Sequence, residues 1–479
     1  MSDYQLASCL KHYKNDQDKV VKPSETVRLA VEKLKKQFDL SSFHLEQRSS
    51  VIEGAYSFSS VSDQLTASGK GLTPEQSQAS AVMEFAERYS WLHFDYKHYD
   101  GYVVKPFNEI KKGSVPTVNE SYFFACFPHL TNRAELLEQV KAMPLKWIKG
   151  VSLNDHRPFY YPISWYNYTE TSNGLATGNA MEEAIVQAIC EVIERENVYR
   201  FYEERQVARD IDLRSVKHPL AVRALTNARS YGIEFIIKDI SFSLGVPTVC
   251  VCGTDPQRRG KLSYRGCGYG THTDPEKALI RALSEYFEGY SLMTNVENEF
   301  KLNWGLIISK LPKKNYGFLT YYNAEVLDRP DKPIWLRDMR DLSRDDIRDE
   351  ILALLKILKK ENHDVIFIDK TNPQLGIPVT RIFVPTFRSL IGTSVIDPDD
   401  LMSKAYYEAG NKPMAQKYYR QLLLKDYYMN PEVSKVKVEQ IYKGDFQEQI
   451  QAMGGIKRDV RVLIKQMEQA LAKAARRGS

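Results

Sequence analysis

Three segments of this 479-residue chain share one pattern, in which a stretch of glycines or small residues, predicted to be a loop, leads into a helix that carries two glutamates three residues apart. The stretches cover residues 69–76, 172–182 and 266–276. A capping box is expected at the start of each helix, and the predicted pairs are Thr73 with Gln76, Asn179 with Glu182, and Thr273 with Glu276. The acid pairs that follow are Glu84 and Glu87, Glu191 and Glu194, and Glu285 and Glu288. A fold for this chain must find room for three such pairs of adjacent negative charges.

The residues around these acids are largely apolar, so we expect the glutamates to be partly buried and to need positive partners. One interpretation supplies those partners as ordinary salt bridges from Arg88, Arg195 and Arg281. The other supplies Mg²⁺, which proteins usually hold with one or two carboxylates and the phosphates of a substrate. Because the pattern occurs three times, the second interpretation is favoured.

Helix geometry limits how such a site is assembled. Each acid pair begins 11 or 12 residues after its predicted cap, which places it roughly 16–18 Å from the N-terminus of its own helix. This distance is too great for one helix to cradle a phosphate at its N-terminus and also hold the metal bound to that phosphate. The site must therefore draw on several helices. Lys70, between two glycines, is the best candidate for a phosphate-contacting cation; an ordinary surface lysine is the alternative.

Strand-like and helical segments alternate between residues 44 and 395, which predicts an α+β core of mixed sheets and helices. β-Branched and aromatic runs mark strands at 235–237, 248–251 and 365–368. A helix, strand, turn and strand ending in Leu244-Gly245-Val246-Pro247 is echoed by one ending in Leu375-Gly376-Ile377-Pro378, at a constant offset of 131 residues. We interpret these as pseudo-repeated halves of one architecture, with a common local arrangement reached twice as the alternative.

The sequence predicts three units along the chain. Residues 1–43 are predicted to be a polar leader followed by a helix that begins near Pro23, and residues 44–395 to be the α+β core. Residues 396–479 lose the strand signal and are predicted to be helical. Within them, residues 401–424 resemble a single tetratricopeptide (TPR) hairpin, and residues 456–476 form an amphipathic pattern.

Composition excludes several classes of protein. The 66 basic and 61 acidic residues give a net charge of only +5, without the basic cluster of a nucleic-acid-binding protein. Six cysteines in so long a chain do not form a disulfide framework, which favours a reducing, cytoplasmic location. The first 20 residues lack the apolar run of a signal peptide, and no segment is apolar for long enough to span a membrane.

The motifs resemble those of the YcaO proteins. The central match is the segment 172–184 with Gln187, Glu191, Glu194 and Arg195. The first YcaO signature is similar to Gly69-Lys70-Gly71 with Ser80-Ala81, Glu84 and Glu87-Arg88-Tyr89-Ser90, and the third to Gly268, Gly270 and His272 with Asp274-Pro275, Ala278, Arg281-Ala282-Leu283 and Glu285. The resemblance covers residues 20 to 395, and three motifs in the same order make it specific.

This resemblance implies a YcaO-like catalytic domain over 44–395 that uses ATP and Mg²⁺ to phosphorylate a backbone amide oxygen of a peptide or protein. A nucleophile then attacks the activated amide, giving a thioamide from a sulfur donor or an azoline from a Cys, Ser or Thr side chain. The implied metal ligands are Glu84, Glu87, Glu191 and Glu194. The implied ATP-binding residues are Lys70, Arg88, Asn179, Glu183, Gln187, Arg195, Arg281 and Glu285. No general base is assigned.

Some features depart from the family pattern. Azoline-forming members often end in a proline-rich segment, whereas this chain ends in 474–479, Ala-Ala-Arg-Arg-Gly-Ser. We therefore favour thioamidation or a related modification, with azoline formation or an accessory role in ribosomal-protein methylthiolation as alternatives. Glu288 lies outside the matching positions, and Gly289 follows it where the other two helices have arginine. The third acid pair is thus expected to be half functional.

Partners and other functions are also expected from these observations. The substrate is a peptide or protein, a TfuA-like or sulfur-donor protein is a candidate partner, and the aromatic surface and repeated halves suggest a homodimer. A non-catalytic binding subunit and a small-molecule ligase with similar carboxylate and Mg²⁺ chemistry are the competing hypotheses.

Three further groups of residues are candidate sites. Cys250, Cys252 and Cys267 lack the spacing and fourth ligand of a zinc site and are expected to be buried free thiols. His272 is expected either to contact phosphate or to serve in capping or packing. The aromatic residues between 91 and 99 are expected in the core or at a dimer surface rather than as a base-stacking platform.

Overall fold

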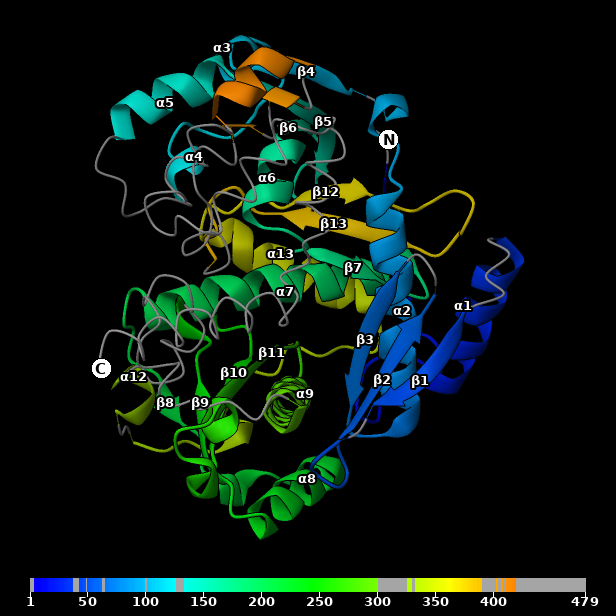
Figure 1. Cartoon of the computed structure of the whole chain (residues 1–479), viewed down its shortest axis with the longest axis vertical. Coiled ribbons are helices and arrows are strands. Elements are labelled where there is room, and N and C mark those ends of the chain that lie inside the picture. Colours follow the sequence, from blue (N-terminus) through cyan, green and yellow to red (C-terminus); the bar gives the residue numbers. More distant parts are fainter. Residues whose placement is uncertain are drawn as a thin grey trace, which may run out of the picture.

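The structure is a computed structural model that describes residues 4–37, 43–48, 50–62, 65–99, 101–125, 133–299, 325–329, 332–389, 402–403, 406–407 and 410–418. These residues form three antiparallel sheets with helices packed on them, so the predicted α+β fold is confirmed (Figure 1). The predicted helix at 456–476 and parts of the hairpin at 401–424, among them residues 419–424, lie outside the described residues. The proposed TPR-like character of that region therefore stays a prediction.

The first sheet has the order β1 (His44–Arg48), β2 (Tyr56–Val61) and β3 (Thr66–Gly71). Two helices accompany it, α1 (Pro23–Gln37) and α2 (Pro74–Leu92), and α2 packs on β2 and β3. Helix α1 begins at the predicted Pro23. Helix α2 carries the first acid pair away from β3 along the side of the molecule (Figure 1).

The second sheet has the order β11 (Arg265–Thr271), β10 (Thr248–Thr254), β9 (Glu234–Asp239) and β8 (Arg209–Asp210). Helix α9 (Pro275–Glu299), which carries the third acid pair, packs on β11 and β10, and α8 (Pro219–Ser230) packs on α9. The short helix α12 (Glu325–Asp328) lies near the edge of this unit (Figure 1). The predicted strands at 235–237 and 248–251 are confirmed.

The third sheet has the order β4 (Val103–Pro106), β5 (Pro144–Ser152), β12 (Ile366–Asp369), β13 (Val379–Phe383) and β7 (Leu175–Thr177), and β6 (Pro158–Tyr161) pairs with β5. Helix α13 (Ile347–Lys360) packs on α7 (Met181–Tyr202). The outer end of the sheet carries α3 (Phe107–Ile110), α4 (Tyr122–Ala125), α5 (Arg133–Ala142) and α6 (Ile163–Thr169) (Figure 1).

Helix α7 occupies the centre of the molecule. It contacts β7 and β13 on one side and β11 on the other, so it lies between the second and third sheets (Figure 1). Apolar side chains on its buried faces, such as Ile185, Ile189 and Ile193, join a core shared with α13 and β13. The central acid pair is thereby held on an element that both sheets fix in place.

The repeat detected in the sequence has the same local structure in both copies. Helix α8 with strands β9 and β10, and helix α13 with strands β12 and β13, are each a helix followed by two antiparallel strands. Gly245 and Gly376, at equivalent places before the second strand, both have φ of +61°. Because only glycine adopts this left-handed backbone without strain, both turns depend on it.

The glycine-rich stretches before α2 and α9 were predicted to be loops, and this prediction was wrong. They are the strands β3 and β11. A Cβ atom added at Gly69 would lie 2.0 Å from the backbone nitrogen of Ala81, and one at Gly268 would lie 2.2 Å from the carbonyl oxygen of Ala282. The glycines therefore serve close packing of each helix on its own strand, a long-range requirement that resembles a loop signal in the sequence.

Candidate functional site

Helices α2, α7 and α9 meet at a cavity of about 440 Å³. The cavity is lined by all twelve residues that the family resemblance assigns to metal or ATP binding: Glu84, Glu87 and Arg88 of α2; Glu183, Gln187, Glu191, Glu194 and Arg195 of α7; Arg281 and Glu285 of α9; Lys70 of β3; and Asn179, just before α7. Residues up to 215 positions apart in the sequence thus face one space. The expectation that several helices contribute to one site is met, while the role of each residue stays a prediction.

The starts of the three helices differ from one another. Thr73 caps α2 as predicted, accepting a hydrogen bond from the backbone nitrogen of Gln76, although the Gln76 side chain accepts from Leu72 rather than from the cap. Helix α7 has Ala180 as its N-cap, with no side-chain cap. The predicted cap Asn179 instead donates its side-chain amide to Glu183 Oε1 at 3.0 Å.

Two further capping predictions were wrong because these side chains have long-range partners. Glu182 accepts hydrogen bonds from Tyr4 and from the backbone nitrogen of Ala7. Thr273 donates to Glu350, and Asp274, one residue later, accepts from the first amides of α9. Tertiary contacts with the N-terminal segment and with α13 therefore replace two local capping boxes.

The ion pairs within the acid helices are long. Arg88 lies 3.3 Å from Glu84 and 3.5 Å from Glu87. Arg195 lies 3.9 Å from each of Glu191 and Glu194. Arg88 and Arg195 are thus neighbours of the acids, as the salt-bridge interpretation expects. At these distances, however, they leave the carboxylates able to bind a further cation. Seven glutamates and five lysine or arginine side chains line the cavity, so carboxyl groups outnumber cations there.

The third helix pairs its acids with a strand rather than with its own arginine. Lys70 lies 2.9 Å from Glu285 and 3.7 Å from Glu288. Arg281 donates to Gln187 Oε1 of α7 at 2.5 Å, so it bridges two of the helices. Glu288, which the sequence placed outside the matching positions, lines the cavity with the other acids.

Burial shifts the ionisation of these acids. It raises the pKa of Glu191 to about 7, and the neighbouring Glu194 adds to the shift. Burial likewise raises the pKa of Glu87, Glu194 and Glu288. At Glu285 burial acts in the same direction, but Lys70 outweighs it and the pKa falls below its ordinary value. Carboxylates that are costly to ionise and lack close cations form a site suited to a cation.

A nucleotide with Mg²⁺ fits the chemistry of this cavity. Two polar atoms in its lining, Arg195 Nε and Thr177 Oγ1, are buried and make no hydrogen bond within the described part of the chain. No group of three or more His, Cys, Asp or Glu side chains among those residues is arranged to hold a metal by itself. Mg²⁺ is usually held by one or two carboxylates and completed by phosphate oxygens, and the cavity wall offers carboxylates on α2, α7 and α9.

Some cavity residues carried no signal in the sequence. Gln17 and Lys19 reach the cavity from the N-terminal segment, and Tyr269 and Ser284 from β11 and α9. Lys19 lies 3.3 Å from Glu183. No local pattern identifies a lysine in a polar leader as part of a site, because its partner lies more than 160 residues away.

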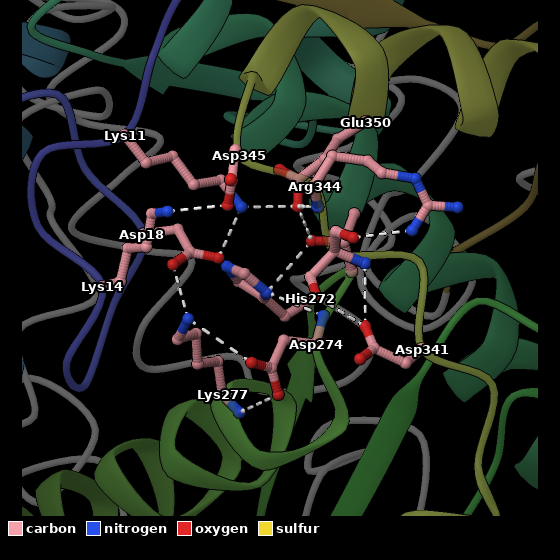
Figure 2. Close-up of polar contacts among 12 residues, drawn as sticks. Lys11, Lys14, Asp18, His272, Asp274, Lys277, Asp341, Arg344, Asp345 and Glu350 are labelled. Atoms are coloured by element: carbon pink, nitrogen blue, oxygen red, sulfur yellow. Dashed lines mark hydrogen bonds and ion pairs between the residues drawn. The ribbon is translucent and has the colours of Figure 1, made fainter.

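The three cysteines, His272 and Tyr99 of the aromatic segment lie in buried parts of the structure outside the cavity. Cys250, Cys252 and Cys267 are buried free thiols. His272 lies in a separate buried polar cluster, where its Nδ1 accepts from the backbone nitrogen of Asp274 at 3.0 Å, and it is not in the cavity lining (Figure 2). Tyr99 belongs to a buried core, which agrees with the core interpretation of the aromatic segment.

Comparison with known proteins places this site in a family. Residues 68–388 match the sequence model of a family described as YcaO cyclodehydratase, ATP- and Mg²⁺-binding. The chain belongs to the YcaO family. The predicted family is thereby confirmed, together with ATP and Mg²⁺ as the family's cofactors.

Two relatives show how far the similarity extends within the YcaO family. An uncharacterised protein of Methanothermobacter thermautotrophicus is 30% identical over 323 residues, which cover 66% of this chain and 80% of that protein. The ribosomal protein S12 methylthiotransferase accessory factor YcaO of Escherichia coli is 24% identical over 258 residues, 48% of this chain and 39% of that protein.

Two solved structures share the YcaO fold with this chain. A heterocyclase in complex with substrate and cofactor superposes with a TM-score of 0.63 at 20% identity, covering 85% of this chain and 57% of that one. YcaO from Methanopyrus kandleri bound with AMPPCP and Mg²⁺ superposes with a TM-score of 0.54 at 18% identity. The match covers 81% of this chain and 99% of that one. Among the described residues of this YcaO protein, no helix combines the length and apolar character needed to cross a membrane.

Proposed function

We propose that this YcaO protein uses ATP and Mg²⁺ to activate a backbone amide of a peptide or protein by phosphorylating its oxygen. In this proposal the metal ligands are Glu84, Glu87, Glu191 and Glu194. The ATP-binding residues are Lys70, Arg88, Asn179, Glu183, Gln187, Arg195, Arg281 and Glu285. The observation that carries the proposal is the convergence of these residues from three helices on one cavity in which carboxyl groups outnumber cations.

The proposed chemistry relies on positioning and charge neutralisation. Phosphoryl transfer needs little covalent participation from the protein, so a cage of cations and metal-binding carboxylates is sufficient. The γ-phosphoryl group would pass from ATP to the amide oxygen, leaving ADP, and a nucleophile would then add to the amide carbon and release phosphate. Lys70, Arg195 and Arg281 are the cations in the cavity wall that would offset the charge of the phosphates.

Thioamidation, or a related modification, is the favoured outcome of amide activation. A relative encoded in the tfuA 3′ region of Rhizobium leguminosarum bv. trifolii is 23% identical over 167 residues, which supports a TfuA-like protein as a partner. Azoline formation is the alternative supported by the family description as cyclodehydratase. An accessory role in ribosomal-protein methylthiolation is supported by the name of the Escherichia coli relative.

The organisation of the chain is part of the same proposal. We propose that residues 44–395 form the catalytic domain, with residues 1–43 as an N-terminal segment and 396–479 as a helical TPR-like region. We also propose that the protein acts in the cytoplasm as a homodimer and binds neither nucleic acid nor membrane.

The test is a reaction of the full chain with ATP, Mg²⁺ and candidate peptides, with and without sulfide. We expect peptide-dependent release of ADP and phosphate, and a peptide mass that shows either oxygen replaced by sulfur or the loss of one water. Glu87→Gln should abolish both signals. ATP turnover at the same rate without any peptide would contradict amide activation and support a small-molecule ligase instead.

A further inference from the structure

A polar cluster with a buried centre joins the N-terminal segment to the starts of α9 and α13 (Figure 2). We call residues 8–20 the N-terminal strap. Asp18 of the strap contacts Lys11 at 2.7 Å through one carboxylate oxygen and Lys277 of α9 at 2.5 Å through the other. Lys11 also contacts Glu350 of α13 at 2.6 Å. The Asp18 carboxylate thus connects two positions of the strap with each other and connects the strap with α9, a helix that lines the cavity.

These contacts are enclosed. The side chains of Lys11, Asp18, Glu350 and Lys277 expose 2%, 4%, 1% and 9% of their surface. Thr273 and the backbone nitrogen of Arg344 also donate to Glu350, so its carboxylate is well satisfied. A closed network of this kind defines one geometry, because a shift of the strap would leave buried charges without partners.

The network sits directly next to residues of the proposed nucleotide site. Lys19, the residue after Asp18, lines the cavity, and the backbone nitrogen of Val20 donates to Glu183 Oε2 at 2.9 Å. On the other side of the contact, Lys277 precedes Arg281 by one helical turn and Glu285 by about two turns on α9. Asp18 therefore ties together two walls of the cavity that are remote in the sequence.

We infer that Asp18 is a positioning residue, which docks the N-terminal strap on α9 and so completes the nucleotide cavity. The inference rests on the proposed function, because it takes the cavity to bind ATP. Docking of the strap and binding of nucleotide are then coupled, and thermodynamic linkage makes the coupling reciprocal. Loss of docking weakens nucleotide binding, and bound nucleotide holds the strap in place.

The experiment measures the affinity for AMPPCP with Mg²⁺ by calorimetry in the full chain. Asp18→Asn removes the charge but leaves Lys11 paired with Glu350 and Lys277 near Asp274. A double variant, Asp18→Asn with Lys277→Met, breaks the same link without leaving Lys277 as a buried unpaired cation. Lys14→Met is the matched control, since Lys14 of the same strap contacts Asp345 at 2.7 Å but both side chains are largely exposed.

We expect roughly tenfold weaker binding in both Asp18 variants, within the usual range of coupling between sites, and a change of less than about twofold in Lys14→Met. Thermal unfolding of each variant separates this effect from loss of fold. Hydrogen exchange supplies a readout that a purely structural role would not change: AMPPCP should slow exchange in the strap of the wild type and not in the double variant.

The possible results separate the two hypotheses. Wild-type affinity in a folded double variant, or strap exchange that nucleotide does not alter, would overturn the role of Asp18 and leave the proposed function standing. A wild-type protein that binds no nucleotide would overturn the proposed function and this inference with it.

Discussion

The cavity and the buried network of Figure 2 are built from the same kinds of side chain, yet they behave differently. In the network, Asp18 has two lysines at 2.7 and 2.5 Å. Burial opposes its ionisation, but His272 and these two lysines together hold the pKa of Asp18 below its ordinary value. In the cavity, Arg195 stays 3.9 Å from Glu191, and burial prevails, raising the pKa of Glu191 to about 7.

This difference teaches how to distinguish a structural salt-bridge cluster from a binding site. The number of acids is not decisive, since both places have several. What differs is whether cations of the protein already satisfy the carboxylates at close range and whether space remains between them. The network is closed, whereas the cavity keeps about 440 Å³ and an excess of acids. The following predictions test that contrast.

The largest expected effect comes from removing one charge in each place. Glu191→Gln should lower ATP-dependent activity about a hundredfold, because it removes a proposed ligand of the Mg²⁺ that would offset the charge of the phosphates, while the protein stays as stable as the wild type or becomes more stable. Glu350→Gln should lower the free energy of unfolding by about 2–3 kcal/mol, because Lys11 loses a partner at 2.6 Å.

Activity assays and denaturant unfolding of both variants check this pair of outcomes. The comparison fails if Glu191→Gln destabilises the protein as much as Glu350→Gln does, since Glu191 would then be an ordinary structural acid.

Dependence on pH gives the next largest effect. The folded pKa of Glu191, about 7, lies above its ordinary value of 4.5, so the folded protein binds a proton more tightly than the unfolded chain does. The contribution of Glu191 to stability is therefore complete below pH 4.5 and is lost as the pH rises through 7. We expect the metal-free protein to lose stability over this range, and Glu191→Gln to reduce the loss.

Asp18 should have the opposite dependence. Its pKa is lowered, so its contribution is present above the ordinary value of 3.8 and is lost as the pH falls below it. The pH dependence attributed to Glu191 is measured by the melting temperatures of the wild type and Glu191→Gln between pH 5 and 8. If the melting temperatures of both proteins fall equally with pH, Glu191 is not the cause.

The smallest effect concerns a third arrangement, a buried cation without an acid. The side chain of Lys370 is fully buried, with Nζ 3.4 Å from the centre of the Phe94 ring and hydrogen-bonded to Tyr96, and no carboxylate pairs with it in the described part of the chain. Burial lowers the pKa of Lys370 well below its ordinary value. Lys370→Met should therefore stabilise the protein by about 1 kcal/mol.

Stabilisation by Lys370→Met should be larger at pH 7 than at pH 10. At pH 7 the lysine of the unfolded chain is protonated, whereas burial disfavours the protonated form in the folded protein, so folding costs the wild type more than it does at pH 10. Unfolding in denaturant at the two pH values measures it. A variant less stable than the wild type at both would show that Lys370 makes a favourable contact that its surroundings do not reveal.

Local patterns in the sequence predicted the acid helices and several strands, but not the contacts between remote segments. The spacing of Glu191 and Glu194 and the strands near 235 and 248 follow from short-range periodicity. Gly268 was misread because its role is to admit the backbone of α9, and Thr273 because Glu350 competes for its hydroxyl. Lys19 was missed because only the folded strap brings it to Glu183.

The most direct test of the central claim, that carboxylates of α2 and α7 hold the metal of a bound nucleotide, is calorimetric titration with AMPPCP in the presence and absence of Mg²⁺. We predict clear binding with Mg²⁺, strongly reduced binding without it, and loss of the Mg²⁺ dependence when Glu87 and Glu191 are both changed to glutamine. Equal affinity with and without Mg²⁺ in the wild type would contradict the claim.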